Sequence, residues 1–410
     1  MSHANSLPIR VWKWLSGFGL ATILLVLLGL LTWLATLEQV EHGLLATLDK
    51  YFHWRAWWVP AELWVFPETL KRPLIIPLPG GYWVCALLLV NMICGGLIRA
   101  RKGWKTAGVL LSHFGIIFMI AAGGVAQLYE ERGVMMLVEG DQADYAISLT
   151  EPTIEVLEIV DGKVSGDVSV ARQRELRGLA QTDLRLVKFP REPFDLEITG
   201  WLTNAMVRPG GEGSPNPTVD GWTLQEREKE KEGELNGPAC YARAVFEDGT
   251  KGDSFILAVP NGRSGMSDYP PVSIEAAGRK FAVRMVKQTI PVPFTVKLED
   301  AVSEYYPNSS KPKSFHSDIQ RIVGNDEPVS LRIEMNEPMR AGGFTFFQRT
   351  MGGGPQMQQG PQFSGFEVVS NPADKWPEYS LYVVTLGLLI HFVMKFSSYL
   401  GTSNRSQPKA

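Results

Sequence analysis

The sequence predicts an α-helical membrane protein with four transmembrane helices and a large β-rich extracytoplasmic domain. Two patterns support this fold class. Four apolar stretches are each long enough to cross a hydrocarbon core of roughly 30 Å as a helix. Between the third and fourth stretches, short runs alternate apolar and polar residues, which is typical of half-buried β-strands. The mean hydropathy of −0.02 over 410 residues averages these two unlike parts.

The first apolar stretch, 15–36, carries no charge and follows an N-terminal segment, 1–14, that contains Arg10 and Lys13. Its length exceeds the roughly 7–15 apolar residues of a signal peptide, and no small-x-small cleavage site follows it. We therefore expect an uncleaved transmembrane helix.

Residues 37–81 are expected to form an amphipathic and aromatic extracytoplasmic segment. Its tryptophans suit the lipid headgroup zone. Apolar residues at helical spacing predict one interfacial helix, on the face formed by Leu37, Val40, Leu44, Leu48 and Tyr51. Prolines and glycines then predict an end to regular structure at Pro73, Pro77, Pro79, Gly80 and Gly81.

The remaining spans are expected over 82–98, 106–128 and 379–398. The loop 99–105 and the tail 399–410 lie on the same side of the membrane as the N-terminal segment, and all three are basic. By the positive-inside rule, that side is cytoplasmic. The basic residues of the loop and tail are Arg99, Arg101, Lys102, Lys105, Lys395 at the border of the tail, Arg405 and Lys409. We therefore expect a multi-pass membrane protein with both termini in the cytoplasm.

The region 129–378 should then lie outside, in the periplasm or its equivalent. Short runs with period two, separated by Gly, Pro, Asn and Asp, indicate an antiparallel β-rich domain. The runs are 153–159, 194–198, 242–246, 281–286, 294–298 and 329–335. Segments 208–221 and 225–234 are expected to be solvated loops, and 351–365 to be a long hairpin tip or an insertion.

One histidine, His113, interrupts the third span. An imidazole is costly to bury in lipid, so it is a functional hypothesis that needs a partner. Mostly small residues at intervals of three and four let another helix approach closely, along the stripe Gly108, Ser112, Gly115, Met119 and Ala122. His113 lies one residue round from this stripe and should face a neighbouring helix or a site between helices. The alternative is a packing histidine bonded to a carbonyl or a Ser.

A second histidine, His391, lies in the fourth span. His113 is about 12 Å along its helix from Lys105, and His391 about 6 Å from Lys395, so both belong to the cytoplasmic half of the membrane. A role of His391 in ligating or handing over a cofactor is one hypothesis, and snorkelling toward the interface is the alternative. Three further histidines are expected to lie outside the membrane as ordinary surface residues, namely His42, His53 and His316.

Composition excludes several function classes. A net charge of −3, a pI near 6.1 and the lack of a basic stripe argue against nucleic-acid binding. The three cysteines show no CxxC, CxxCH or zinc-like spacing, so the chain has neither a thiol-exchange motif nor its own c-type haem attachment site. Cys85 and Cys94 point in roughly opposite directions on a helix, which argues against a thiol pair.

Several short stretches occur in an order that resembles a known family. They are Leu-Glu-Gln-Val-Glu-His-Gly at 37–43, Lys-Tyr-Phe at 50–52, Pro-Leu-Pro-Gly-Gly at 77–81, Leu-Ser-His-Phe-Gly at 111–115, Pro-Phe-Thr-Val-Lys-Leu at 293–298, Tyr-Pro-Asn at 306–308, Lys-Pro-Lys-Ser-Phe-His-Ser at 311–317, Glu-Met-Asn-Glu-Pro-Met at 334–339, Gly-Phe-Thr-Phe-Phe-Gln at 343–348 and Ser-Asn-Pro at 370–372. Together they resemble the ResB family of cytochrome c biogenesis proteins, also called CcsB-like, over nearly the whole chain. Their ordered combination is what makes the resemblance specific.

The resemblance implies a subunit of the System II cytochrome c synthetase, which carries haem across the membrane and presents it to apocytochrome c. The implied partner is a CcsA/ResC-type membrane subunit with a Trp-rich haem-binding segment, which this chain lacks. His113 matches the family's intramembrane axial ligand of the transported haem b, opposite a histidine of the partner. This chain would then be a non-catalytic or accessory subunit of the haem lyase complex.

Two other classes of function stay open. A b-type electron-transfer subunit would bind haem for redox chemistry, and would need paired histidines at opposite depths or a quinone site. A membrane-anchored scaffold would bind a partner through its β-domain, with incidental histidines. A further hypothesis assigns the segments 306–317 and 343–348 of the outer domain to docking the partner or apocytochrome c.

Overall fold

The computed structural model describes residues 7–403, except 64–73, 172, 177, 212, 261–268, 308, 310 and 353–361. The chain forms two compact units. The first comprises Met1–Glu130 with Asn371–Ala410, and the second is Glu131–Ser370. The predicted basic residues Arg405 and Lys409, and most of the predicted 351–365 hairpin tip, lie outside the described residues.

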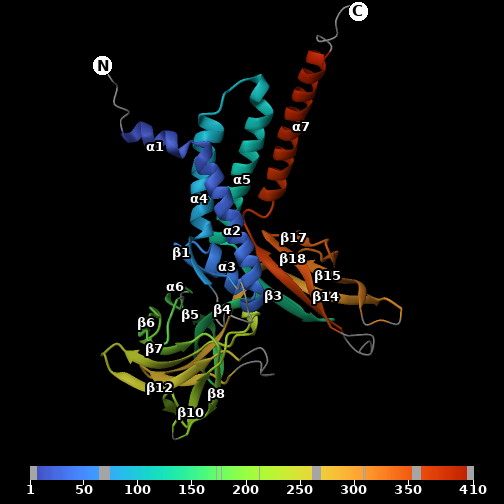
Figure 1. Ribbon diagram of the computed structural model, residues 1–410. Helices are drawn as coiled ribbons and strands as arrows, with labels where there is room; N and C mark the ends of the chain where they lie inside the picture. The colour runs from blue at the N-terminus through green and yellow to red at the C-terminus, as the bar shows by residue number, and fades with distance from the viewer. Residues whose placement is uncertain are drawn as a thin grey trace, which may run out of the picture. The chain divides into compact units, whose positions relative to one another are not determined.

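The first unit is mainly helical (Figure 1). Its helices are α1 (Leu7–Leu15), α2 (Phe18–His42), α3 (Leu44–Phe52), α4 (Gly81–Asn91), the π-helix η1 (Met92–Ile98), the 3₁₀ turn η2 (Trp104–Thr106), α5 (Ala107–Tyr129) and α7 (Trp376–Ser403). Within the part of the chain that the structure describes, four helical segments are long and apolar enough to cross a membrane, namely Phe18–His42, Gly81–Ile98, Trp104–Tyr129 and Trp376–Leu400. The four long apolar helices of the predicted fold class are therefore confirmed.

A break separates α1 from α2. The side-chain amide of Asn91 donates hydrogen bonds to the carbonyl oxygens of Leu15, at 2.6 Å, and Gly17, at 3.1 Å. Arg99 donates to the hydroxyl of Ser16 at 3.0 Å. Because the last carbonyls of a helix have no intrahelical partners, the bond to Leu15 satisfies the end of α1. The three bonds together tie the break to α4 and to Arg99, which follows η1.

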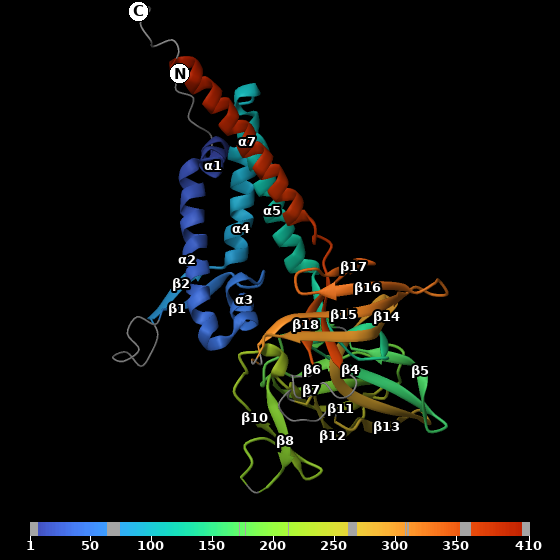
Figure 2. The ribbon, with the colours of Figure 1, turned by 90° about the vertical axis from the view of Figure 1, so that its right-hand side faces the viewer.

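The segment after α2 differs from the prediction in two ways. A single interfacial helix over 37–51 is wrong, because the chain breaks at Gly43, whose φ of 81° ends α2, and Tyr51 of α3 is fully buried. Two of the predicted prolines, Pro77 and Pro79, do not end regular structure, and Pro73 lies outside the described residues. Pro77 and Pro79 lie in an antiparallel ribbon of β1 (Trp58–Leu63) and β2 (Leu74–Pro79), beside the C-terminal half of α2 (Figure 2). A two-stranded ribbon tolerates proline because each strand has an unpaired edge.

The helices α5 and α7 pack backbone to backbone. Small residues line their contact, here called the α5–α7 seam, which consists of Gly108, Ser112 and Gly115 of α5 and Ser380, Val384 and Gly387 of α7. The hydroxyl of Ser112 donates to the carbonyl oxygen of Val384 at 3.3 Å. A Cβ added to Gly387 would lie 2.4 Å from Oγ of Ser112. The predicted small-residue stripe therefore does admit a neighbouring helix, although Met119 is exposed.

The second unit is almost entirely β-structure. Its elements are β3 (Glu131–Val138), β4 (Gln142–Val160), β5 (Lys163–Val170), α6 (Gln173–Leu176), β6 (Arg185–Val187), β7 (Phe194–Leu202), β8 (Ala205–Pro209), β9 (Thr218–Val219), β10 (Trp222–Glu226), η3 (Gly233–Leu235), β11 (Ala239–Phe246), β12 (Lys251–Ala258), β13 (Val272–Ala276), β14 (Arg279–Tyr305), β15 (Pro312–Ile322), β16 (Val329–Glu334), β17 (Met339–Ala341), β18 (Phe344–Met351) and β19 (Phe363–Ser370). The predicted β-rich domain is thus confirmed, and each of its six predicted runs lies largely within a strand.

The strands form three antiparallel sheets. The largest follows the order β16-β15-β14-β4-β3-β19-β18-β17, with β13 paired to β14 and β5 paired to β4. The others follow the orders β12-β11-β7-β6 and β8-β10-β9. The strand β14 is 27 residues long and contributes to two cores, through Phe281 to one and through Phe294 to the other. Between them its register against β4 shifts near Pro291, where the missing N–H interrupts the ladder.

We predict that Gly387→Ala destabilises the helical unit by about 1–3 kcal/mol, because the added methyl forces α7 away from α5. Gly124→Ala is the matched control, since a Cβ there meets nothing within 4 Å. Thermal unfolding of both variants in detergent measures the difference. Equal stabilities would show that the α5–α7 seam tolerates a side chain.

Candidate functional site

His113 lies on the face of α5 next to the α5–α7 seam and is half-buried. Its Nδ1 is 3.1 Å from the carbonyl oxygen of Gly96 in η1. The predicted neighbouring helix for His113 is therefore η1, whereas α7 packs against the adjoining face of α5. Among the described residues, Nε2 of His113 has no hydrogen-bond partner.

The π-helix η1 brings two glycines against different neighbours. A Cβ on Gly95 would lie 2.8 Å from the carbonyl oxygen of Ser16, and a Cβ on Gly96 would lie 3.0 Å from Nδ1 of His113. The backbone N–H of Arg99 bonds to the carbonyl of Cys94, five residues earlier, which is the π-helical spacing. The sequence predicted a helix over this segment but not its widened last turn.

The structure does not pair His391 with His113. The backbone of His391 lies against Gly108, because a Cβ on that glycine would lie 2.6 Å from the amide nitrogen of His391. Its half-buried ring meets that of Phe392 edge to face, with centroids 6.1 Å apart. Of the contacts that the described residues make, none joins the two imidazoles.

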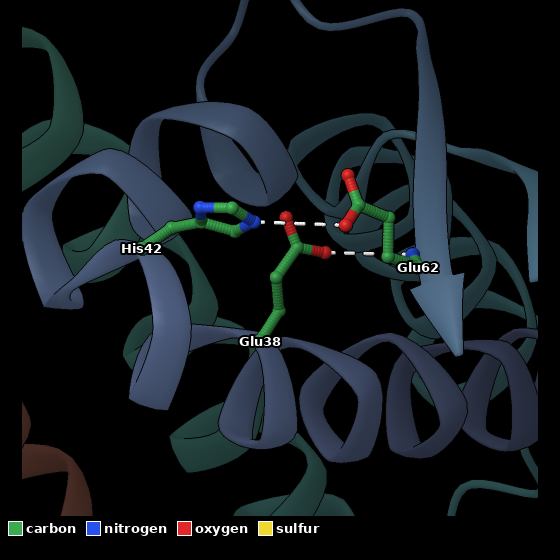
Figure 3. A group of neighbouring side chains, drawn as sticks. All are labelled: Glu38, His42 and Glu62. Atoms are coloured by element: carbon green, nitrogen blue, oxygen red, sulfur yellow. Dashed lines mark hydrogen bonds and ion pairs between the residues drawn. The ribbon is translucent and has the colours of Figure 1, made fainter. Parts of the chain in front are cut away.

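A charged cluster that the sequence did not predict lies at the end of α2. Figure 3 shows Glu38 and His42 on α2 reaching toward Glu62 of β1. The ammonium of Lys50 bonds to Glu38 and, at 3.2 Å, to Glu62. Tyr51 donates to Glu38 at 2.8 Å, and His42 lies 3.6 Å from Glu62. Glu38 is only 1% exposed, so these partners are what make its burial tolerable.

The environment shifts two pKa values in this cluster. Burial and the hydrogen bond to Glu38 raise the pKa of Tyr51 well above its ordinary value of 10. Burial alone would raise the pKa of Glu62, but the hydrogen bond and charge of Lys50 outweigh it and hold this pKa below 4.5. Both shifts favour the neutral phenol and the ionised carboxylate that the hydrogen bonds require.

The cluster has the ligand types of a metal site but is satisfied without one. One atom each from Glu38, His42 and Glu62 lie within 4.8 Å of one another. Carboxylate and imidazole groups at this spacing can bind a divalent cation. The Lys50 ammonium already pairs with both carboxylates, so the arrangement is that of a structural ion-pair network.

A sequence signal for Glu38 did exist. The buried face of α2 includes Leu31, Leu34 and Glu38, which are spaced at three and four residues. Continuing the apolar stripe would therefore have placed this carboxylate on the buried face. The position of Lys50 could not be inferred, because it depends on the reversal of the chain at Gly43.

Two stretches of the proposed docking region meet in a buried polar network. The hydroxyl of Ser317 in β15 donates to Oε1 of Gln348 in β18 at 2.8 Å and lies 2.7 Å from Oγ of Ser364 in β19. The amide of Gln348 donates to Ser364 at 2.6 Å. Both serines are fully buried. The stretches 311–317 and 343–348 therefore help to hold strands β15, β18 and β19 together, independently of any role in docking.

The helices and strands define a class of protein, and comparison with known families narrows it. Four apolar helices suggest a membrane protein, here carrying a large β-rich unit. The model of the ResB-like family matches residues 271–361. Among curated proteins, no sequence matches the chain. The resemblance to the ResB-like family is therefore confirmed, over a segment that runs from β13 through β18.

We predict that Lys50→Met lowers the free energy of unfolding by about 3–5 kcal/mol, because it leaves the buried carboxylate of Glu38 without a counter-charge. The control is Lys375→Met, which removes the exposed pair with Glu378 at 2.9 Å and should cost less than about 1 kcal/mol. Denaturant titration of both variants in detergent distinguishes them. Equal losses would contradict a special role for the buried cluster.

The lowered pKa of Glu62 predicts acid sensitivity. Because folding favours its carboxylate form, the contribution of Glu62 is fully present above pH 4.5 and is lost as the pH falls through the folded-state pKa. Glu62→Gln should therefore lose less stability than the wild type between about pH 5 and pH 3. Identical acid profiles for the two proteins would rule out this linkage.

Proposed function

We propose that this protein is a haem-handling subunit of a System II cytochrome c synthetase. The match to the ResB-like family points to cytochrome c biogenesis. The observation that carries the finer proposal is His113, a histidine within an apolar helix whose Nδ1 is bonded and whose Nε2 has no partner among the described residues. Nε2 is thereby available to a metal that enters between helices.

In this proposal the four apolar helices span the bacterial inner membrane with both termini in the cytoplasm. The segment Gly81–Ile98 has 18 residues and a length of about 27 Å, which suits a bilayer core. Exposed tryptophans lie at both of its ends: Trp57 stacks on Trp83 near its start, and Trp104 follows the basic residues after its end. Such belts are typical of membrane interfaces. The β-rich unit then lies in the periplasm.

We propose that His113 is one axial ligand of haem b, the transported cargo. The ring fits this role, because its Nδ1 is held by the protein and its Nε2 is left to donate a lone pair. A histidine of the CcsA/ResC-type partner would supply the second ligand and give a six-coordinate, low-spin iron. We also propose that His391 of α7 helps to ligate haem or to hand it over, since its backbone packs against Gly108 of α5, the helix that carries His113.

The chain's own part in the reaction is to bind and orient haem. We assign covalent attachment to apocytochrome c to the partner's external site, so this chain acts as a non-catalytic, accessory subunit. The β-rich unit offers an external surface for the partner or apocytochrome c. Its segment matched to the ResB-like family includes β14 and β15 and supports this assignment.

The alternatives make different demands on the chain. An electron-transfer subunit needs a second ligand within its own helices, and no described contact brings His391 to His113. A scaffold needs no haem at all, and would predict the same spectrum with or without His113. Haem content therefore separates these classes of function.

We predict that His113→Ala, purified with the ResC-type partner, loses most of its low-spin haem absorption and matures less cytochrome c. The reason is that it removes one of two axial ligands. Added imidazole, which can enter the vacated space, should restore part of the spectrum.

The control is His42→Ala, because His42 is 49% exposed and outside the apolar core of its helix. It should keep the haem spectrum of the wild type. Wild-type haem content and cytochrome c maturation in His113→Ala would exclude the ligand role and favour the scaffold.

A further inference from the structure

The carbonyl oxygen of Gly96 is an orphan acceptor at a helix end. It belongs to the last turn of η1, where a helix leaves its carbonyls without intrahelical partners. Nδ1 of His113 lies 3.1 Å from this oxygen. Because a carbonyl can only accept, the hydrogen bond requires the proton of the neutral imidazole to sit on Nδ1.

This hydrogen bond determines what the other ring nitrogen can do. In the neutral imidazole, a proton on Nδ1 leaves Nε2 as a lone-pair donor. Histidines that bind metals usually donate their other N–H to a carbonyl or carboxylate, which fixes the ring and raises its basicity. The Gly96 carbonyl provides this arrangement from the protein backbone, before any ligand arrives.

The missing side chain of Gly96 matters as much as its carbonyl. A Cβ there would lie 3.0 Å from Nδ1, 3.4 Å from Cγ and 3.7 Å from Cβ of His113. The first of these contacts is tighter than ordinary van der Waals contact, so the imidazole would have to move by a few tenths of an ångström. Glycine lets the ring reach the carbonyl without this displacement.

We propose that Gly96 is the positioning residue for His113: its backbone selects the Nδ1–H tautomer and directs Nε2 toward the haem iron. This inference rests on the proposed function, in which Nε2 is the axial ligand. The α5–α7 seam contributes by fixing the rotation of α5, since Ser112 is bonded to Val384 on the adjoining face. Because α5 is held by its contact with α7, the side chain of His113 projects from α5 in one fixed direction.

The test compares Gly96→Ala with Gly123→Ala, each in the full chain purified with the ResC-type partner. Gly123 is a suitable control because a Cβ there meets nothing within 4 Å. Gly96→Ala should bind haem at least about tenfold more weakly, as expected when the partner of a metal-binding histidine is lost. Its remaining haem should have a higher reduction potential, because a less basic imidazole stabilises ferric iron less. Gly123→Ala should match the wild type in both.

A double variant separates positioning from damage to the fold. If Gly96 acts only through the ring of His113, Gly96→Ala/His113→Ala without added imidazole should retain as much residual haem as His113→Ala without imidazole. Lower loading of the double variant would mean that Gly96 acts through helix packing, and would overturn the proposal. Wild-type affinity and potential in Gly96→Ala would overturn it as well.

The outcomes also distinguish this inference from the proposed function. Loss of haem in His113→Ala with normal haem in Gly96→Ala leaves the ligand in place and removes only the positioning role. Normal haem in His113→Ala removes the ligand itself, and the role of Gly96 with it.

Discussion

Close backbone packing around α5 is the constraint on which the helical unit depends. On one face, Gly108 and Gly387 allow α7 to approach until backbone atoms touch. On the next face, Gly96 admits the ring of His113 to a carbonyl at 3.1 Å. Without a hydrophobic driving force between helices in lipid, such contacts are a main source of helix association. They also fix the rotation of α5, so the stability of the unit and the direction of His113 have a common origin.

Two groups of buried polar side chains outside this packing are satisfied by near neighbours. Glu38 is bonded to Lys50 and Tyr51, and Ser317 to Gln348 and Ser364. Leaving such groups unpaired would cost about 1–3 kcal/mol each, and more for a charge. These buried polar residues therefore have structural reasons to be present, and they need not mark a docking surface. His113 differs from them because one of its ring nitrogens keeps no partner among the described residues.

The elements that could be predicted from sequence are those that depend on a repeated pattern. Four apolar helices and the alternating runs of β4, β7, β11, β14 and β16 follow from hydropathy averaged over many residues. The features that were missed depend on single residues or on contacts distant in sequence. Gly43 breaks a continuous amphipathic pattern, and the widened turn of η1 leaves no periodic trace. The prolines of β2 are tolerated because β2 belongs to a two-stranded ribbon and has an unpaired edge. The pairing of His113 with Gly96 belongs to the second kind, since it joins two helices.

The most direct measurement is a structure of this chain bound to the proposed ResC-type partner and loaded with haem. We expect density from Nε2 of His113 to the iron, with Nδ1 still within hydrogen-bond distance of the Gly96 carbonyl and a histidine of the partner on the opposite side. A haem ligated by residues of the partner alone, with His113 packed as it is in the free chain, would contradict the assignment of the ligand and leave this protein as a scaffold.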